Sequence, residues 1–217
     1  MIKGLPPNPK ILDIGCGPGV QTLDLAELTD GNIIAIDLHT KMIERTRKMV
    51  AEKGFENKVQ VLQMDMKEMD FPSQEFDLIW SEGAIYVIGF RNGLEKIRPL
   101  VKKGGYVAVS EAVWLKPDPP KIAQIHWEEY PEIDTIDEKL SIINELNYEI
   151  VGHFVLPAEA WTKDYYDQLE IKITTLANQW EGISEAMEVI EEARREVEVF
   201  KKYHDYFSYC FFVMKKK

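Results

Sequence analysis

The chain has 217 residues, of which 45% are hydrophobic and 29% charged, an ordinary composition for a globular protein. Its formal net charge is −11 and it has no basic arm or stripe, so we expect no nucleic-acid partner. No apolar run approaches the roughly 18 residues of a membrane span, and the N-terminus lacks a signal-peptide pattern. These features predict a cytoplasmic protein that does not associate with membranes.

The first half of the chain alternates apolar runs with amphipathic segments. The apolar runs predict five buried strands, at 11–14, 32–37, 59–64, 76–80 and 106–110. The amphipathic segments predict helices between them, at 20–28, 40–54 and 89–98. Such alternation is typical of a parallel sheet covered on both faces, which is an α/β fold.

The second half of the chain is more helical. A proline-rich linker leads to a short helix near residue 125, and further elements are predicted as a helix at 135–146 and a strand at 148–156. Apolar residues at steps of three and four predict two helical segments, at 161–180 and 183–200, without a strand between them. A last strand is predicted at 206–214. We therefore expect one domain over residues 1–217, with 157–203 as a helical insertion or cap before the final strand.

A glycine-rich turn follows the first predicted strand. Gly15, Gly17 and Gly19 alternate between that strand and a helix, an order that places a helix N-terminus and free amides at a strand end. This arrangement is typical of nucleotide binding. A dinucleotide fingerprint reads G-x-G-x-x-G, whereas the third glycine here comes one residue early.

Acidic residues accompany this turn and end the next two strands. Asp13 stands two residues before the first glycine. Asp37 ends the second strand, where a carboxylate can accept both hydroxyls of a ribose. Asp65 follows the third strand, where it can accept a hydrogen bond from an exocyclic amine. Each acid taken singly is also consistent with a carboxylate that only caps a loop, but together they predict a ribose and an adenine without a pyrophosphate.

Five motifs then resemble those of the class I S-adenosylmethionine-dependent methyltransferases. They are Ile-Leu-Asp-Ile-Gly-Cys-Gly-Pro-Gly, Ile-Asp-Leu, Gln-Met-Asp-Met, Phe-Asp-Leu-Ile-Trp-Ser-Glu-Gly and Leu-Val-Lys-Lys-Gly-Gly-Tyr, in the family's order. The resemblance runs from about residue 10 to 214, and within the family it is closest to small-molecule "type 11" enzymes. It implies a Rossmann-like, seven-stranded sheet of order 3-2-1-4-5-7-6, with the last strand antiparallel and helices on both faces.

The resemblance also implies S-adenosyl-L-methionine as cofactor and methyl transfer to a small molecule by in-line displacement. The glycines would approach the methionine part, Asp13 would anchor the loop or contact the ammonium, and Ser81 would lie near the sulfonium. The ribose would bind Asp37, and the adenine would lie against Leu38 and Met66 with its amine on Asp65. The implied cofactor-binding residues are Asp13, Gly15, Cys16, Gly17, Gly19, Asp37, Leu38, Asp65, Met66 and Ser81.

No catalytic residue is assigned by the sequence. Glu82, Tyr86 and Glu111 follow or end the fourth and fifth strands and are candidates, and each glutamate is equally consistent with a solvated or capping acid. Late aromatic residues are expected either to pack helices or to line a pocket that could hold a cationic amine. These residues are Trp114, Trp127, Tyr130, Trp161, Tyr165 and Tyr166.

Other expectations concern metals, partners and alternative functions. Cys16 and Cys210 stand far apart and the four histidines have no ligand spacing, so we expect neither a metal nor a disulfide framework. The oligomeric state is expected to be monomer or homodimer. One alternative is an NAD-dependent oxidoreductase. The other is a non-catalytic cofactor-binding protein without the N-terminal lid that family members form, because only nine residues precede Lys10.

Overall fold

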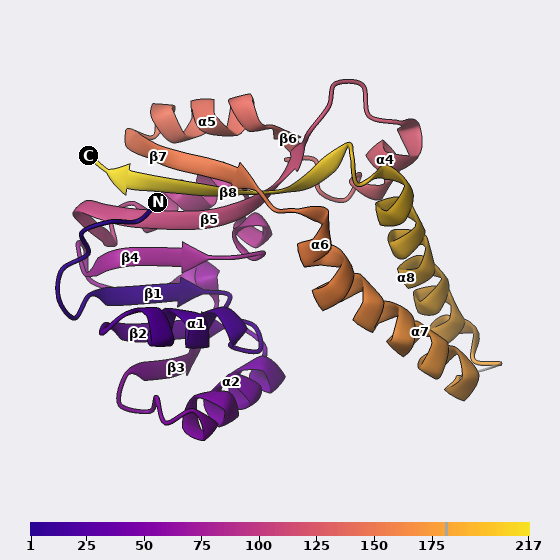
Figure 1. Ribbon diagram of the computed structural model, residues 1–217, viewed down its shortest axis with the longest axis horizontal. Helices are drawn as coiled ribbons and strands as arrows, with labels where there is room; N and C mark the ends of the chain where they lie inside the picture. The colour runs from indigo at the N-terminus through magenta and orange to yellow at the C-terminus, as the bar shows by residue number, and fades with distance from the viewer. Residues whose placement is uncertain (181) are drawn as a thin grey trace. The chain divides into compact units, whose positions relative to one another are not determined.

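A mostly parallel β-sheet, with eight strands within the described residues 1–180 and 182–217, organises this computed structural model. The strand order is β3-β2-β1-β4-β5-β8-β7, and β6 pairs with β5 (Figure 1). The strands are β1 (Lys10–Ile14), β2 (Asn32–Asp37), β3 (Val59–Gln63), β4 (Phe76–Ser81), β5 (Val101–Trp114), β6 (Asp134–Thr135), β7 (Tyr148–Val155) and β8 (Phe207–Lys216). With the two-residue β6 set aside, this is the predicted order 3-2-1-4-5-7-6.

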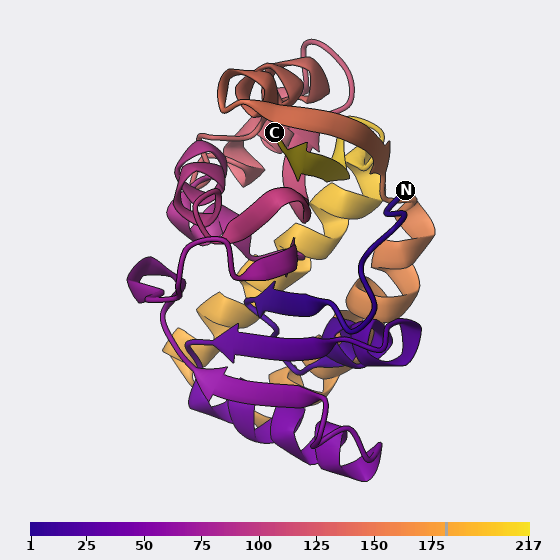
Figure 2. The same cartoon turned by 90° about the vertical axis from the view of Figure 1, so that its left-hand side faces the viewer.

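The strand directions also follow the prediction. β1 pairs in parallel with β2 and β4, and the pairs β2–β3 and β4–β5 are parallel as well. Figure 2 shows β1, β2 and β3 side by side with their arrows in one direction. The arrow of β8 runs opposite to those of β1 and β4 (Figure 1). The strand β5 is longer than the predicted 106–110, because it already pairs with Phe76 at Val101 and extends to pair with β6.

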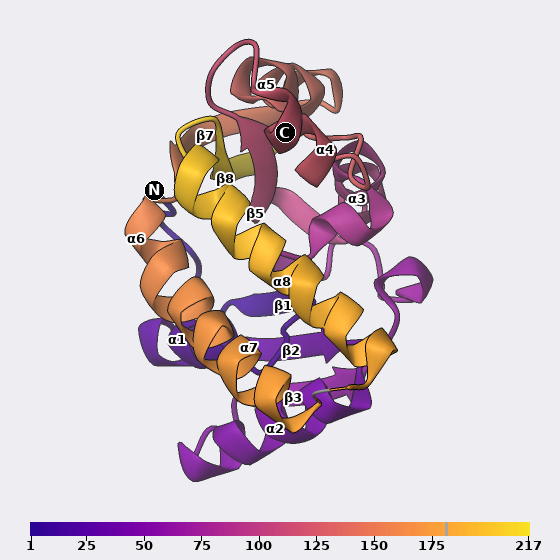
Figure 3. The same ribbon diagram turned by 90° about the vertical axis from the view of Figure 1, so that its right-hand side faces the viewer.

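Helices cover the sheet on both faces, with α1 and α3 on opposite sides (Figure 2, Figure 3). Because each face is covered, the strands can bury side chains on both faces of the sheet. Ile11, Ile36 and Ile79, which belong to three different strands, are all fully buried. The helices are α1 (Val20–Leu28), α2 (Thr40–Glu52), α3 (Phe90–Ile97), α4 (Lys121–His126), α5 (Ile136–Glu145), α6 (Ala158–Trp161), α7 (Asp167–Gln179) and α8 (Ser184–Tyr203), with shorter turns η1 (Met66–Glu68), η2 (Ile85–Ile88) and η3 (Thr162–Tyr166).

The chain divides into two compact units. The first, which we call the sheet unit, comprises Met1–Glu111, Asp137–Phe154 and Phe211–Lys217. The second, which we call the helical unit, comprises Ala112–Ile136 and Val155–Cys210, so it contains residues 157–203. That these residues form an insertion within a single methyltransferase domain stays a prediction.

Two amphipathic helices form most of the helical unit. α7 and α8 lie side by side (Figure 1, Figure 3) and share a core that includes Ile173, Ile190 and Phe200. The first predicted segment, 161–180, is not one α-helix, because the π-helical turn η3 separates α6 from α7. Among the described residues no helix is both long enough and apolar enough to cross a membrane.

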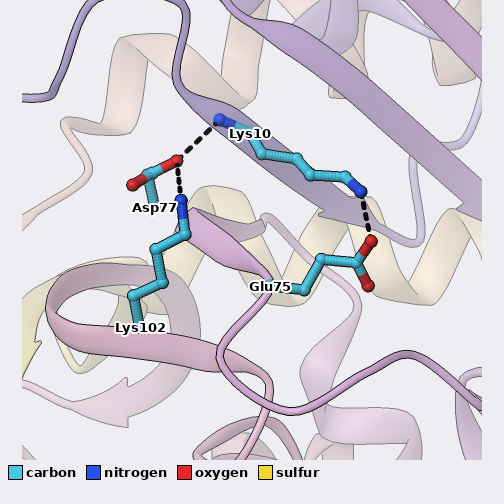
Figure 4. Close-up of polar contacts among 4 residues, drawn as sticks. All are labelled: Lys10, Glu75, Asp77 and Lys102. Carbon is cyan, nitrogen blue, oxygen red and sulfur yellow. Dashed lines mark hydrogen bonds and ion pairs between the residues drawn. The ribbon is translucent and has the colours of Figure 1, made fainter.

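Charged side chains join the amino ends of three strands in the sheet unit (Figure 4). Asp77 Oδ2 accepts hydrogen bonds from the backbone amide of Lys10, at 2.9 Å, and from Lys102 Nζ, at 2.8 Å. Lys10 Nζ forms an ion pair with Glu75. The carboxylate of Asp77 therefore links the start of β1 to β4 and β5, at the edge opposite the glycine turn.

We expect Asp77→Ala to lower the free energy of unfolding by about 1–3 kcal/mol, because it leaves the Lys10 amide and the Lys102 ammonium without this acceptor. Urea denaturation followed by circular dichroism measures the change. The matched control, Asp70→Ala, removes an exposed carboxylate of the same unit and should change stability by less than roughly 0.5 kcal/mol. Equal effects of the two variants would contradict the linking role of Asp77.

Candidate cofactor pocket

The glycine turn between β1 and α1 is held to the end of β2 by its own backbone. The amides of Gly15 and Cys16 both donate to the carbonyl of Ile36, each at 2.9 Å. The amide of Gly17 donates to Asp37 Oδ2 at 3.0 Å. For residues 15–17 the expectation of free amides is therefore wrong, because β2 supplies the acceptors.

The end of the turn is closed by packing against α2. Gly19 has a φ of 92° and donates its amide to the carbonyl of Cys16, and Pro18 has no amide to donate. A Cβ on Gly19 would lie 2.7 Å from Thr46 Cγ2, and Thr46 Oγ1 donates to the carbonyl of Gly17 at 2.8 Å. The amides of residues 15, 16, 17 and 19 thus all donate within the chain.

Gly15 and Gly17 have different reasons to be glycine. Gly15 has a φ of +70°, and a Cβ there would lie 2.3 Å from Ala84 Cβ. Gly17 has a φ of +52°, and a Cβ there would meet no described atom within 4 Å. Gly15 is therefore required for packing, whereas Gly17 leaves open space beside its backbone that a ligand can occupy.

A pocket of about 330 Å³ opens at the carboxyl ends of β1, β2 and β3. Seven residues singled out from the sequence line it, which are Gly15, Gly17, Asp37, Leu38, Asp65, Met66 and Tyr86. Further lining residues were not assigned from the sequence, and they include Met42, Met64, Gly83, Ala84 and Val87. The sequence contained a signal for Gly83, because a glycine follows the end of β4 as Gly17 follows the end of β1. In the structure Gly83 has a φ of +60°.

The two acids at the strand ends cap turns and line the pocket at once. Asp37 Oδ1 accepts the amide of His39, and Asp65 Oδ1 accepts the amide of Lys67 at the start of η1, both at 2.8 Å. The local capping function is therefore present. An ionised carboxylate has about four acceptor positions, so each acid retains capacity for a ligand in the pocket that it lines.

Other predicted cofactor residues are buried and do not line this pocket. Ser81 is fully buried and donates to the carbonyl of Ile14 at 3.1 Å, which ties the end of β4 to the end of β1. Burial raises the pKa of the Cys16 thiol to about 12, so the thiol stays protonated near neutral pH. Ser81 and Cys16 therefore belong to the buried structure next to the pocket and not to its lining.

Asp13 is buried beneath the glycine turn. Its Oδ2 accepts a hydrogen bond from Thr22 Oγ1 at 2.6 Å, which joins β1 to α1. Burial raises the pKa of Asp13 to about 7, the bond from Thr22 opposes the shift, and the charges of Glu82 and Asp37 add to it. Of the two predicted roles, this geometry fits the loop anchor.

The three catalytic candidates lie in different environments. Tyr86 lines the 330 Å³ pocket. Glu82 lines a second pocket of about 470 Å³ with Gln21 and Trp80, and burial raises the pKa of Glu82. Glu111 is fully buried and pairs with Lys139 Nζ at 2.9 Å. Nothing in the described part of the chain gathers three His, Cys, Asp or Glu residues in a group that could hold a metal ion.

The comparison with protein families decides the identity of this fold. Residues 11–105 match the model of the methyltransferase domain family. Residues 11–105 therefore carry a methyltransferase domain. The resemblance given by the five motifs is thereby confirmed, and the matched residues of the domain include the whole 330 Å³ pocket.

Individual relatives of the methyltransferase domain are distant. The sterol 24-C-methyltransferase of Aspergillus fumigatus is 28% identical over 116 residues, which cover 53% of this chain and 30% of that protein. The sarcosine/dimethylglycine N-methyltransferase of Aphanothece halophytica is 24% identical over 182 residues, with 78% and 65% covered. The chain thus spans less than a third of the length of that sterol enzyme.

A solved structure shows the same fold. An S-adenosylmethionine-dependent methyltransferase from Geobacter sulfurreducens, in complex with S-adenosyl-L-homocysteine, superposes with a TM-score of 0.84 at 17% identity. The superposition covers 98% of this chain and 86% of that one. The Rossmann-like α/β fold predicted for the methyltransferase domain is therefore confirmed.

Substitution of the two glycines should separate packing from ligand binding. We expect Gly15→Ala to lower the melting temperature strongly, because its Cβ would overlap that of Ala84. Gly17→Ala should cost only about 1 kcal/mol in stability, for the left-handed backbone, while weakening binding of S-adenosyl-L-homocysteine about tenfold or more. Thermal melts and isothermal titration calorimetry measure both effects. Similar melting temperatures for the two variants would contradict the distinction.

The raised pKa of Asp13 predicts a pH dependence of stability. The unfolded state releases the Asp13 proton near the ordinary pKa of 3.8, while the folded state keeps it until about pH 7. The burial therefore makes the free energy of unfolding fall as pH rises between these values. In Asp13→Asn this fall should be absent, with a gain above pH 7 of about 1.4 kcal/mol per unit of pKa shift.

Urea denaturation at pH 4 to 8 tests the pH dependence against Asp30→Asn, which changes an exposed aspartate of the same unit. The Asp30→Asn profile should run parallel to that of the unsubstituted protein. A parallel profile for Asp13→Asn as well would show that Asp13 is not protonated in the folded state.

Proposed function

We propose that this chain binds S-adenosyl-L-methionine in the 330 Å³ pocket and transfers its methyl group to a small-molecule acceptor. The observation that carries the proposal is the position of Asp37 and Asp65 on the wall of one pocket, with the open backbone of Gly17 beside them. A ribose, an adenine amine and a close approach to the glycine turn require this combination of groups.

Each lining residue has a part in holding the cofactor. Asp37 would accept the ribose hydroxyls with the oxygen positions that the amides of Gly17 and His39 leave available. Asp65 would accept the adenine amine with its second oxygen, since its first is bonded to Lys67. Leu38 is 53% exposed, and together with Met66 it offers an apolar surface to a purine ring.

The cofactor supplies a methyl group already activated on a sulfonium. The protein has to orient the acceptor and exclude water, and it needs a base only for an acceptor that carries its proton at neutral pH. The buried ion pair with Lys139 argues against Glu111 as that base. Glu82 and Tyr86 remain the candidates, because both line pockets of the sheet unit.

Two relatives support a small molecule as the acceptor. Their names give a sterol and sarcosine or dimethylglycine as what those enzymes methylate. The net charge of −11 also disfavours a polyanionic substrate. The cytoplasmic location and the monomeric or dimeric state stay predictions.

The alternatives receive no comparable support. A dinucleotide would place its pyrophosphate against the glycine turn, where the amides of residues 15, 16, 17 and 19 already donate within the chain. The comparisons with known proteins give support neither to an NAD-dependent oxidoreductase nor to a non-catalytic relative.

Titration with S-adenosyl-L-homocysteine tests the cofactor assignment, and Asp65→Asn is the sharpest variant. The asparagine oxygen can still accept the amide of Lys67, while its NH₂ group replaces the acceptor meant for the adenine amine. We expect affinity to fall about tenfold or more, with an unchanged melting temperature.

Asp70→Asn is the matched control, because it changes an exposed aspartate outside the pocket and should leave the affinity as it was. Unchanged affinity in Asp65→Asn would overturn the assigned adenine position. Absence of binding in the unsubstituted chain, or tighter binding of NAD, would overturn the cofactor itself.

A further inference from the structure

A pocket built mainly from aromatic side chains lies within the helical unit. It measures about 150 Å³ and lies among residues of α4, η3, α8 and β8. Its wall includes the rings of Trp127, Trp161, Tyr166, Phe200 and Tyr209, with the carboxylate of Glu196 among them. We call this space the aromatic pocket. A single water takes roughly 30 Å³, so the aromatic pocket has room for a group of several heavy atoms.

The rings of the aromatic pocket form a connected wall. The ring centroids of Trp161 and Tyr209 are 5.0 Å apart at an angle of 44°. Tyr166 stacks on Phe200 at 4.2 Å, and Trp161 lies 6.3 Å from the same phenylalanine. Aromatic faces carry a negative quadrupole, so a wall of inclined rings attracts a cation that is large and weakly hydrated.

The charge of the aromatic pocket is negative. Glu196 is half-buried, and over the side chains that the structure describes it forms no ion pair. Among the described side chains no lysine or arginine lines the pocket, and His126 is the one basic residue on its wall. Burial lowers the pKa of His126, although the charge of Glu196 opposes that shift. The carboxylate also lies close enough to Tyr166 to add to the rise in its pKa that burial causes. A half-buried anion without a cationic partner favours a cationic ligand.

Two polar atoms of the aromatic residues lack hydrogen-bond partners within the described part of the chain, which is unusual for a well-packed core. The indole Nε1 atoms of Trp127 and Trp161 are buried and have no hydrogen-bond acceptor among the described residues. Buried indole N–H groups usually find one, because an unmet donor costs about 1–3 kcal/mol. These two donors can be met by an acceptor atom, such as a hydroxyl oxygen, on a ligand that also carries a cationic group.

We propose that the aromatic pocket binds a small organic cation, namely a tertiary or quaternary ammonium group. The methyl groups of such a cation lie against the aromatic rings, and its charge balances Glu196. This inference does not rest on the proposed methyl transfer, since the aromatic pocket is formed by residues of the helical unit alone.

Two probes of equal shape test this proposal. Isothermal titration with choline and with 3,3-dimethylbutan-1-ol, its neutral isostere, compares the same volume with and without the charge. We expect choline to bind at least tenfold more tightly. Equal affinities for the two probes would show that the pocket binds apolar groups without preference for the charge, which would overturn the proposal. Absence of choline binding would overturn it as well.

A substitution on α8 tests whether the cation binds beside the carboxylate of Glu196. Glu196→Gln keeps the shape of the side chain but removes its charge, so choline affinity should fall at least tenfold. The matched control is Glu192→Gln, an exposed glutamate one turn earlier on the same helix, which should bind choline as the unsubstituted chain does. Unchanged choline affinity in Glu196→Gln would overturn the assignment.

The affinity for S-adenosyl-L-homocysteine, measured on the same samples, should be equal in all three proteins, because the 330 Å³ pocket belongs to the sheet unit. This readout separates failure of the aromatic pocket from failure of the cofactor assignment. The comparison of the two probes on the unsubstituted chain decides the proposal even where Glu196→Gln does not fold.

Discussion

The attachment of the glycine turn to β2 is the constraint on which the cofactor pocket depends. Three successive amides of the turn donate hydrogen bonds to two residues of β2, namely to the carbonyl of Ile36 and to the carboxylate of Asp37. The pairing of Ile14 with Ile36 in the parallel ladder sets this alignment. A slip of one residue would turn Asp37 to the other face of the sheet and remove the acceptor for Gly17. The register of two buried strands thus fixes the shape of the turn and one wall of the pocket together.

The same carboxylates serve the fold and the proposed ligand. Asp37 and Asp65 each hold a backbone amide, which orients them before any ligand arrives and reduces the entropy lost on binding. Asp13 is different, because burial favours its protonated form and its partner is Thr22 within the chain. Acids that look alike in sequence therefore have different tasks, set by their exposure to the pocket.

The aromatic residues of the helical unit illustrate a limit of periodicity. Steps of three and four residues predicted helices at 161–180 and 183–200. The second forms as α8, whereas the π-helical turn η3 divides the first. The same pattern left open whether the rings pack a core or line a pocket. In the structure they do both, since Tyr166 and Phe200 are buried in the core while they line the aromatic pocket. Glu196 gives that pocket its charge, and nothing in the helical pattern distinguishes this residue from the other glutamates of the segment.

The sequence by itself determined the strands, the glycine turn and the acids at the strand ends, because apolar periodicity and turn residues act over a few neighbours. Through its motifs it also implied the strand order. Only the tertiary structure decided which glycine packs and which opens to a ligand, and that the turn's amides are already bonded. It also decided that Glu111 meets Lys139, 28 residues away, in a buried ion pair. These outcomes depend on contacts between distant segments, whose geometry is fixed only when the sheet and its covering helices close around one core.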